Sequence, residues 1–369
     1  MIGTRPEAIK LAPVAAALEQ AGALPLLYLT GQHPGLNSAD HGLAGAVAVA
    51  LGCRGHSDPL EYVEDVAGEL ERFWRLAPPD MVMVQGDTSS TLGGARAAHR
   101  CAVPLAHVEA GLRSFDPRLP WPEEQFRIEI DRIADLLFAP TEIARANLCR
   151  EQVEGELHVT GNSGIDALLE KLSSMPRARR RARPRRPFNL LVTCHRREQW
   201  GDGLVALASA LIALANAGDA AITFVLHPNP EVAGAMWTML GSEKDIRLIA
   251  PLGHAAMIEE MRRADLILSD SGGIQEEAPA LGIPLLVLRD KTERPECIAS
   301  GNARIVGLDS ERLIAAVREL LGDTAALAAM AVPRFPFGDG RAAPRIAALA
   351  MAWLDARRDD ERHQHSLTA

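Results

Sequence analysis

Short apolar runs alternate along the chain with segments whose apolar residues have helical spacing. Polar residues hardly interrupt the runs, as is typical of parallel strands that are buried on both faces. The runs form two series: MVMVQGD (81–87), PLAHVE (104–109) and LLFAPT (136–141), then NLLVTCH (189–195), ITFVLHP (222–228), RLIAPL (247–252), LILSD (266–270) and PLLVLR (284–289). Strands that alternate with helices in this way predict an α/β fold with parallel sheets.

Since there are two series, we predict two doubly wound, Rossmann-like domains that face each other across a cleft. The 369 residues suffice for two domains of ordinary size. We place the first domain at 1–164, rejoined by a C-terminal helix at 345–369, and the second at 165–344. The arginine-rich stretch at 176–188 could be a basic patch for a ligand or membrane, but its near lack of apolar residues favours an irregular, solvated connection.

The composition is that of a globular protein without a general affinity for polyanions. Hydrophobic residues make up 47% and charged residues 24% of the chain. A net charge of -9 provides no basic field for nucleic acid or an anionic membrane, so an anionic ligand needs a local site. The five cysteines are scattered without a CxxC pair, which favours reduced thiols, and no signal peptide or membrane-length apolar run is visible. These features predict a cytoplasmic protein with no nucleic-acid or membrane partner.

The stretch LILSDSGGIQEE predicts an anion site at the start of a helix. Ser271, Gly272 and Gly273 follow an apolar strand, at the edge where open α/β sheets bind ligands. Glycines let a diphosphate approach the backbone N–H groups, and the helix dipole adds a favourable potential. Glu277 is placed one turn later to reach ribose hydroxyls, and Arg294 follows the next strand, where it could meet a phosphate. The alternative is an ordinary turn with a serine cap.

The first predicted domain offers a cation and carboxylates at similar positions. Arg5 stands at the entrance of a helix whose first residue we expect to be Pro6, and it could bind an anion or pair with Glu7. Asp87 follows a strand, where it could act in chemistry or cap the next helix. Glu109 ends a buried strand, a place where a carboxylate is hard to explain structurally.

Two further motifs complete a candidate site. PWPEEQFRIEIDRIAD predicts a helix near Pro122 with Glu123 and Glu124 in its first turn, where the helix dipole favours acidic residues in any case. His195 ends a strand of the second domain beside two arginines, which favours a site over a structural role. Together these groups could bind a nucleoside diphosphate and act on what it carries. Neither metal-ligand spacing nor a GxGxxG fingerprint occurs, so we expect no metal and no cofactor.

In this order, the motifs GTRPEAIKLAPV, GDTSST, HVEAGLRS, PEEQFR, HRRE, HPNP and DSGGIQEEAP…TERPE resemble those of the non-hydrolysing UDP-N-acetylglucosamine 2-epimerases. The resemblance implies a two-domain fold of the glycosyltransferase-B type and a homodimer. It also implies interconversion of UDP-N-acetylglucosamine and UDP-N-acetylmannosamine without a redox cofactor.

The resemblance further implies roles for individual residues. The catalytic positions are Asp87, Glu109, Glu123 and His195. The substrate-binding positions are Arg5, Lys10, Ser271, Gly272, Gly273, Glu277 and Arg294. A second, activating UDP-sugar site of bacterial members corresponds to Gln32, His33, Arg197 and His227. This chain departs from the usual pattern at Cys194, at Phe126 and after TGQHPGLN, which leaves open both allosteric activation and the sugar's substituents.

The chemistry of the sugar favours an elimination. Its C2 proton has no adjacent carbonyl group to acidify it, whereas departure of UDP would place positive charge at C1 and make that proton removable. The 2-acetamidoglucal so formed is reprotonated on the other face before UDP returns, which is the route that the resemblance implies. Arg5, Arg294 and the glycine-rich helix start would stabilise the leaving diphosphate, and the carboxylates would move the proton. The assignment of acid and base stays open.

Several alternatives share parts of this pattern. An epimerase of the same fold could act on a modified UDP-sugar such as a diacetamido uronic acid, and a hydrolysing relative would release free N-acetylmannosamine. A glycosyltransferase would need an acceptor, which three clustered carboxylates do not favour. A non-catalytic UDP-sugar sensor would bind without turnover.

Only Met1 and Ile2 precede the first ligand-binding turn, GTRPEA. A doubly wound domain places its first strand in the middle of the sheet, and two residues are fewer than such a strand needs. We therefore expect the first strand to be truncated, with neighbouring edges unpaired and Arg5 poorly anchored. Restoring about six apolar residues upstream is then expected to raise the melting temperature and tighten UDP binding.

Overall fold

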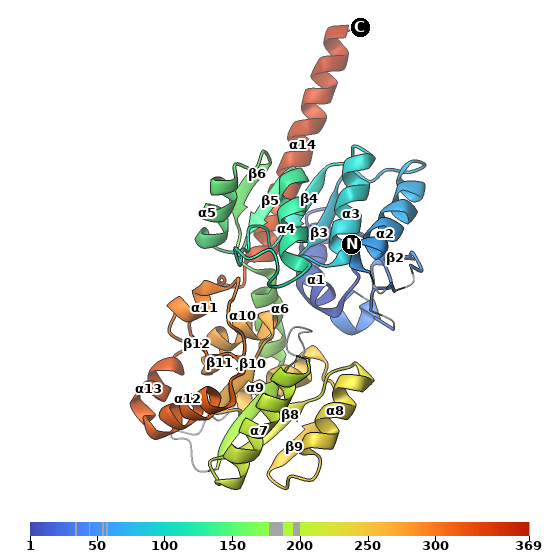
Figure 1. The fold of residues 1–369 in the computed structure, drawn as a ribbon. Helices are drawn as coiled ribbons and strands as arrows, with labels where there is room; N and C mark the ends of the chain where they lie inside the picture. The colour runs from blue at the N-terminus through green and yellow to red at the C-terminus, as the bar shows by residue number, and fades with distance from the viewer. Residues whose placement is uncertain are drawn as a thin grey trace. The chain divides into compact units, whose positions relative to one another are not determined.

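The computed structural model describes residues 1–368 except 34, 44, 54, 57, 177–186 and 195–199, so most of the arginine-rich stretch lies outside the described residues. The chain divides into two compact units. Unit 1 comprises Met1–Leu169 and Phe337–Ala369, and unit 2 comprises Glu170–Pro336 (Figure 1). All strand pairs within the sheets are parallel, and a strand lies within each of the predicted runs, so the predicted α/β class is confirmed.

Unit 1 has a four-stranded and a two-stranded sheet. The first has the order β3 (Val82–Gln85), β4 (Leu105–Val108), β5 (Leu136–Ala139) and β6 (Glu156–Val159), and the second pairs β1 (Leu26–Leu29) with β2 (Val47–Ala50). The helical segments are α1 (Arg5–Gln20), η1 (Ser38–His41), α2 (Pro59–Trp74), α3 (Ser89–Arg100), α4 (Glu123–Ile133), α5 (Glu142–Glu151), α6 (Ser163–Ser174), which runs on into unit 2, and α14 (Ala342–Thr368).

Helices cover both faces of the four-stranded sheet because side chains alternate along its strands. On β4, Leu105 packs in a cluster with residues of α2, α3 and α4, whereas Ala106 and Val108 pack in another cluster with residues of α1 and α14. The first residues of α14 are fixed to α6, since the amides of Ala342 and Ala343 donate to the Asp166 carboxylate at 3.1 and 2.9 Å. The chain therefore returns to unit 1 at its end.

Met1 and Ile2 lie between β1 and β3. The amide of Ile2 donates to the carbonyl oxygen of Tyr28 at 2.9 Å, and its own carbonyl oxygen accepts from the amide of Thr30 at 3.0 Å. On the other side, the amino group of Met1 donates to the carbonyl oxygen of Met83 at 3.0 Å. Backbone hydrogen bonds of these two residues thus connect the two sheets of unit 1.

Unit 2 has one six-stranded sheet. Its order is β12 (Ala303–Ile305), β11 (Leu285–Val287), β10 (Leu266–Ser269), β7 (Phe188–Thr193), β8 (Ala220–Val225) and β9 (Ile246–Ile249). The helices are α7 (Asp202–Asn216), α8 (Pro230–Leu240), α9 (His254–Arg263), α10 (Gly272–Leu281), α11 (Pro295–Ala299), α12 (Ser310–Gly322) and α13 (Thr324–Met330). The strand order reverses between β7 and β10, which is the topological switch point where doubly wound sheets bind ligands.

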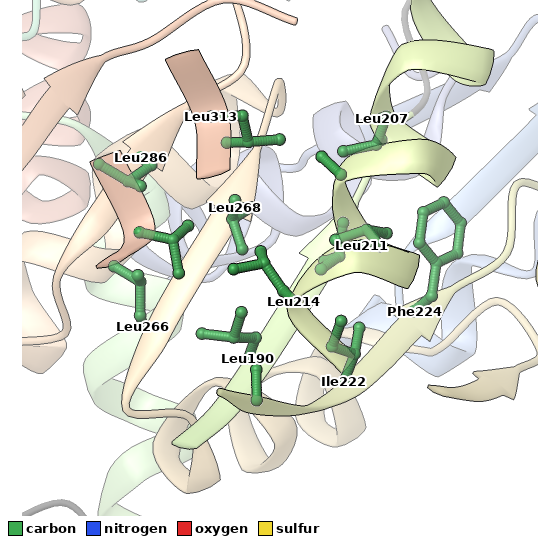
Figure 2. Close-up of a cluster of buried hydrophobic side chains, with 14 of the residues drawn as sticks. Leu190, Leu207, Leu211, Leu214, Ile222, Phe224, Leu266, Leu268, Leu286 and Leu313 are labelled. Atoms are coloured by element: carbon green, nitrogen blue, oxygen red, sulfur yellow. The ribbon is translucent and has the colours of Figure 1, made fainter. Parts of the chain in front are cut away.

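The core of unit 2 lies between this sheet and helices that include α7 and α12. Leu207, Leu211 and Leu214 follow one another at helical spacing on α7, and all three are fully buried. Figure 2 shows them against Leu190 of β7 and Ile222 of β8. A continuous apolar layer fixes the sheet, so the ends of β7 and β10 are held on a rigid support.

Candidate functional site

Glu109 directly follows β4, and its backbone is left-handed, with φ of 72°. Such a conformation costs a residue other than glycine on the order of 1–3 kcal/mol and persists only where its surroundings hold it. The amide of Glu109 donates to the carbonyl oxygen of Phe138 at 3.0 Å. Its carboxylate oxygens accept from Nζ of Lys10 at 2.8 and 2.7 Å, and the amide of Gln85 donates to one of them. Glu109 is therefore a buried carboxylate paired with an ammonium group.

Asp87 follows β3 and does not cap α3. Thr88 is the N-cap, because its hydroxyl accepts from the amide of Thr91 at 3.2 Å. The alternative that Asp87 is only a helix cap is therefore wrong. Its carboxylate instead accepts from Nε of Arg127 at 3.1 Å and also from Nη2. The Asp87 side chain is 28% exposed, against 3% for Arg127, so Asp87 is the solvent-facing member of this ion pair.

The two glutamates at the start of α4 have different surroundings. Glu124 accepts from the amides of Ser114 and Phe115 at 2.9 Å and from Nη1 of Arg127 at 2.9 Å, so it holds the preceding loop. Glu123, the catalytic candidate, is the first residue of α4 and is half-buried. Position alone did not distinguish these two carboxylates in the sequence.

Arg5 is the first residue of α1, so the prediction that Pro6 begins this helix is wrong by one residue. Thr4 is the N-cap, with extended backbone, and its amide donates to the Glu7 carboxylate at 3.0 Å. The amide of Arg5 donates to Nδ1 of His33 at 3.3 Å.

The predicted second-site residues of unit 1 also lie at this loop. His33 donates its amide to the carbonyl oxygen of Gly3 at 2.9 Å. Gln32 accepts from the amide and hydroxyl of Ser90 at 3.1 and 2.6 Å. Gly3 packs so closely on Ser90 that a side chain would collide with it, which explains why this position is glycine. Gln32 and His33 therefore contact the start of α3 and the loop before Arg5.

The glycine-rich stretch of unit 2 follows β10 at the switch point. Ser271 is the N-cap of α10, as in the alternative reading of this stretch, and its hydroxyl accepts from the amide of Ile274 at 3.5 Å. A Cβ on Gly272 would lie 2.7 Å from Cζ of Arg294, whereas a Cβ on Gly273 would meet nothing closer than 3.9 Å. The guanidinium of Arg294 thus covers Gly272, and the helix start at Gly273 stays uncovered.

Carboxylates fix Arg294 at this helix start. Its Nε donates to Glu276 at 2.6 Å, and its Nη1 donates to Glu293. Glu277 pairs with Nε2 of His254, at 2.7 Å, at the start of α9. A held guanidinium beside the N–H groups of a helix start is suited to a phosphate.

The structure separates the candidates into two groups. Arg5, Lys10, Asp87, Glu109 and Glu123 belong to unit 1, and Ser271, Gly272, Gly273, Glu277 and Arg294 belong to unit 2. His195 and Arg197 lie outside the described residues. In unit 2, Nδ1 of His227 accepts from the amide of Asn229 at 2.9 Å, and its ring contacts Trp200.

Sequence reasoning missed several residues of the site. Arg127, Gln85 and His254 are partners of predicted site residues, and none of them stands in a turn or at a strand end. Arg127 does lie one turn after the predicted Glu123 and Glu124, and this spacing was the available signal.

Within the described part of the chain, no group of three or more His, Cys, Asp or Glu side chains is placed to hold a metal ion. A search of the same residues finds no helix with the length and apolarity to span a membrane.

Two Rossmann-like units of this kind define a nucleotide-sugar enzyme with the fold of the glycosyltransferase-B type. A family model described as UDP-N-acetylglucosamine 2-epimerase matches residues 17–350. The UDP-N-acetylglucosamine 2-epimerase of Escherichia coli (strain K12) is 38% identical over 371 residues, which cover 94% of this chain and 96% of that protein. The chain belongs to the UDP-N-acetylglucosamine 2-epimerase family.

Solved structures agree with this assignment. The UDP-GlcNAc 2-epimerase of Neisseria meningitidis, bound to UDP-GlcNAc, has a TM-score of 0.88 at 33% identity, with 95% of this chain and 98% of that chain covered. The enzyme of Methanocaldococcus jannaschii, in complex with UDP-GlcNAc and UDP, has a TM-score of 0.84 at 34% identity, with the same shares covered.

Proposed function

We propose that this chain interconverts UDP-N-acetylglucosamine and UDP-N-acetylmannosamine through elimination and re-addition of UDP. One observation carries the proposal beyond family membership. Asp87 and Glu109 follow the neighbouring strands β3 and β4, and each is held by a cation, Arg127 or Lys10. Two carboxylates on one sheet edge can serve a proton that leaves one face of C2 and returns to the other.

In the first step, the bond between C1 and the diphosphate oxygen breaks, and its electron pair leaves with UDP. A carboxylate takes the C2 proton, and the electrons of the C2–H bond form the C1=C2 double bond of 2-acetamidoglucal. In the second step, a carboxylic acid delivers a proton to the opposite face of C2, and the diphosphate oxygen attacks C1. Inversion at C2 requires two proton-transferring groups, for which Asp87, Glu109 and Glu123 are the candidates.

The leaving group is the part of the substrate that unit 2 is suited to hold. The N–H groups of α10 around Gly273 and the guanidinium of Arg294 offer fixed positive potential to the departing diphosphate. Such groups accelerate the reaction because the negative charge on UDP grows in the transition state. Glu277, held by His254, would accept hydrogen bonds from the ribose hydroxyls.

Incubation with UDP-N-acetylglucosamine in deuterated water, followed by NMR, tests the proposal. We expect both epimers to appear with deuterium at C2. Glu109→Gln, purified in parallel, controls for a contaminating epimerase and is expected to exchange far more slowly. Epimers that retain the original hydrogen at C2 contradict the elimination, and free N-acetylmannosamine as the product identifies a hydrolysing enzyme instead.

The predicted homodimer and cytoplasmic location accompany this proposal. Light scattering behind a sizing column measures the first, and cell fractionation measures the second.

A further inference from the structure

The buried face of α4 carries charged residues where an amphipathic helix usually carries apolar ones. Glu124, Arg127 and Asp131 are spaced by three and four residues, so they form one stripe, and all three are buried. Glu124 holds the loop at Ser114, and Arg127 holds Asp87. Buried ion pairs are weak evidence for stability, because apolar residues often replace them without loss. The third member, Asp131, therefore needs its own explanation.

Asp131 connects three groups that are distant in the sequence. Its Oδ1 lies 2.6 Å from Nδ1 of His107, and its Oδ2 accepts from the amide of Gly111 at 3.1 Å and from Nη2 of Arg113 at 2.8 Å. Burial alone would raise the pKa of Asp131, but His107 and Arg113 together lower it below the usual range. Asp131 is therefore an ionised carboxylate that accepts a hydrogen bond from the backbone.

The far side of His107 reaches the neighbouring strand end. Its Nε2 lies 2.8 Å from the carbonyl oxygen of Gly86, and a carbonyl only accepts, so Nε2 carries a proton. Gly86 immediately precedes Asp87, and Gly111 follows Glu109 by two residues. The contact from Gly86 through the imidazole and the carboxylate to Gly111 thus joins the backbones beside both carboxylates.

The backbone between these anchor points is unusual on both strands. Gly86 and Gly111 have φ of 76° and 85°, and Glu109 between β4 and Gly111 is left-handed as well. On one side, the amide of Glu109 is bound to the carbonyl oxygen of Phe138, and on the other, the amide of Gly111 is bound to Asp131. The turn that presents Glu109 is therefore held at both ends, and Asp131 provides one of them.

We infer that Asp131 and His107 are positioning residues that set the placement of Asp87 relative to Glu109. The inference rests on the proposed function of these two carboxylates. Neither positioning residue needs to touch the substrate, since each acts through the backbone that it holds.

Alanine and asparagine at position 131, compared with a matched control, test the inference. Asp131→Ala removes all three contacts, and we expect it to lower kcat by roughly 100-fold, the scale of a misplaced catalytic group, while the Kd for UDP stays near the wild-type value. Asp131→Asn should recover most of the activity, because its amide can accept from Gly111 and donate to Nδ1 of His107. The control is Asp135→Ala, since Asp135 accepts from the amide of Leu105, at 2.8 Å, at the other end of β4.

The control separates positioning from stability. Asp135→Ala loses a similar carboxylate–amide bond, so we expect a lower melting temperature with unchanged kcat. If Asp131→Ala also lowers only the melting temperature and leaves kcat unchanged, the inference is overturned. Should Asp131→Ala fail to fold, His107→Asn takes its place, because asparagine can keep the contact to Asp131 and lose the one to Gly86. The same fall in kcat is expected, and wild-type kcat in this variant overturns the inference.

A wild-type protein that fails to turn over UDP-N-acetylglucosamine would contradict the proposed function and not the positioning. A crystal structure of Asp131→Ala then decides the inference without any assay of activity. We expect the backbone at Gly86 or Glu109 to move, and wild-type positions for both would overturn it.

Discussion

The two adjacent glycines at the start of α10 give a sharp test, because a methyl group is expected to act differently at each. Alanine at Gly272 would place its Cβ 2.7 Å from Cζ and Nη1 of Arg294. The guanidinium cannot swing aside freely, since Glu276 and Glu293 hold it. Alanine at Gly273 would meet only the Ser271 hydroxyl, at 3.9 Å. Gly272→Ala is therefore expected to disturb the unit itself, and Gly273→Ala only its ligand.

The expected size follows from overpacking. Forcing an extra methyl group into a packed site costs about 1–3 kcal/mol. In a domain of the size of unit 2, each kcal/mol shifts the melting temperature by about 2–4 °C, so Gly272→Ala should unfold roughly 2–12 °C lower. Gly273→Ala should not unfold at a lower temperature, because alanine is the better helix former.

Calorimetric titration with UDP completes the test. Both variants should bind UDP more weakly, Gly272→Ala because Arg294 moves and Gly273→Ala because its methyl group blocks the approach to the helix N–H groups. A lost charge-assisted hydrogen bond, about 1.5–3 kcal/mol, corresponds to roughly 10- to 150-fold in Kd. Gly234→Ala, on an open face of α8, is the control and should change neither quantity for the worse.

Two outcomes would refute this reasoning. If Gly272→Ala unfolds at the wild-type temperature, Arg294 is not held against this helix start. If Gly273→Ala binds UDP as tightly as the wild type, the diphosphate does not lie at this turn.

Asp87→Asn should keep UDP binding nearly intact while turnover falls roughly 100-fold or more, and kcat and Kd that change together would contradict this division of roles. Arg294→Ala should do the reverse, with a higher Kd for UDP by calorimetry. Burial raises the pKa of Glu7 above its usual value of 4.5, against hydrogen bonds that include those from Thr88 and Gly3. An acid whose pKa is higher in the folded state stabilises the fold fully below its unfolded pKa, and this stability is lost as the pH rises through the folded pKa. The wild type should therefore lose free energy of unfolding relative to Glu7→Gln as the pH rises from about 4.5. Urea titrations across this range measure the difference, and parallel curves would contradict it.

Local sequence was sufficient for the strand and turn positions that carry the candidate residues. The apolar runs before Asp87, Glu109 and Ser271 are strands because they are buried on both faces, and each ends where polar or glycine residues begin. The missed strands β2 and β6 are mostly exposed or half-buried, so their residues lack the continuous apolar pattern of a central strand.

The sequence could not predict which side chains meet. Asp87 and Arg127 are 40 residues apart, and Lys10 and Glu109 are 99 apart. Their contacts arise because parallel strands bring their carboxyl ends to one edge while α1 and α4 pack on the sheet. Side-chain pairing at such an edge depends on strand order, register and helix packing together, none of which is encoded within a single motif. Residue types and turn positions were therefore determined by the sequence, whereas the ion pairs that hold the carboxylates were decided only by the tertiary structure.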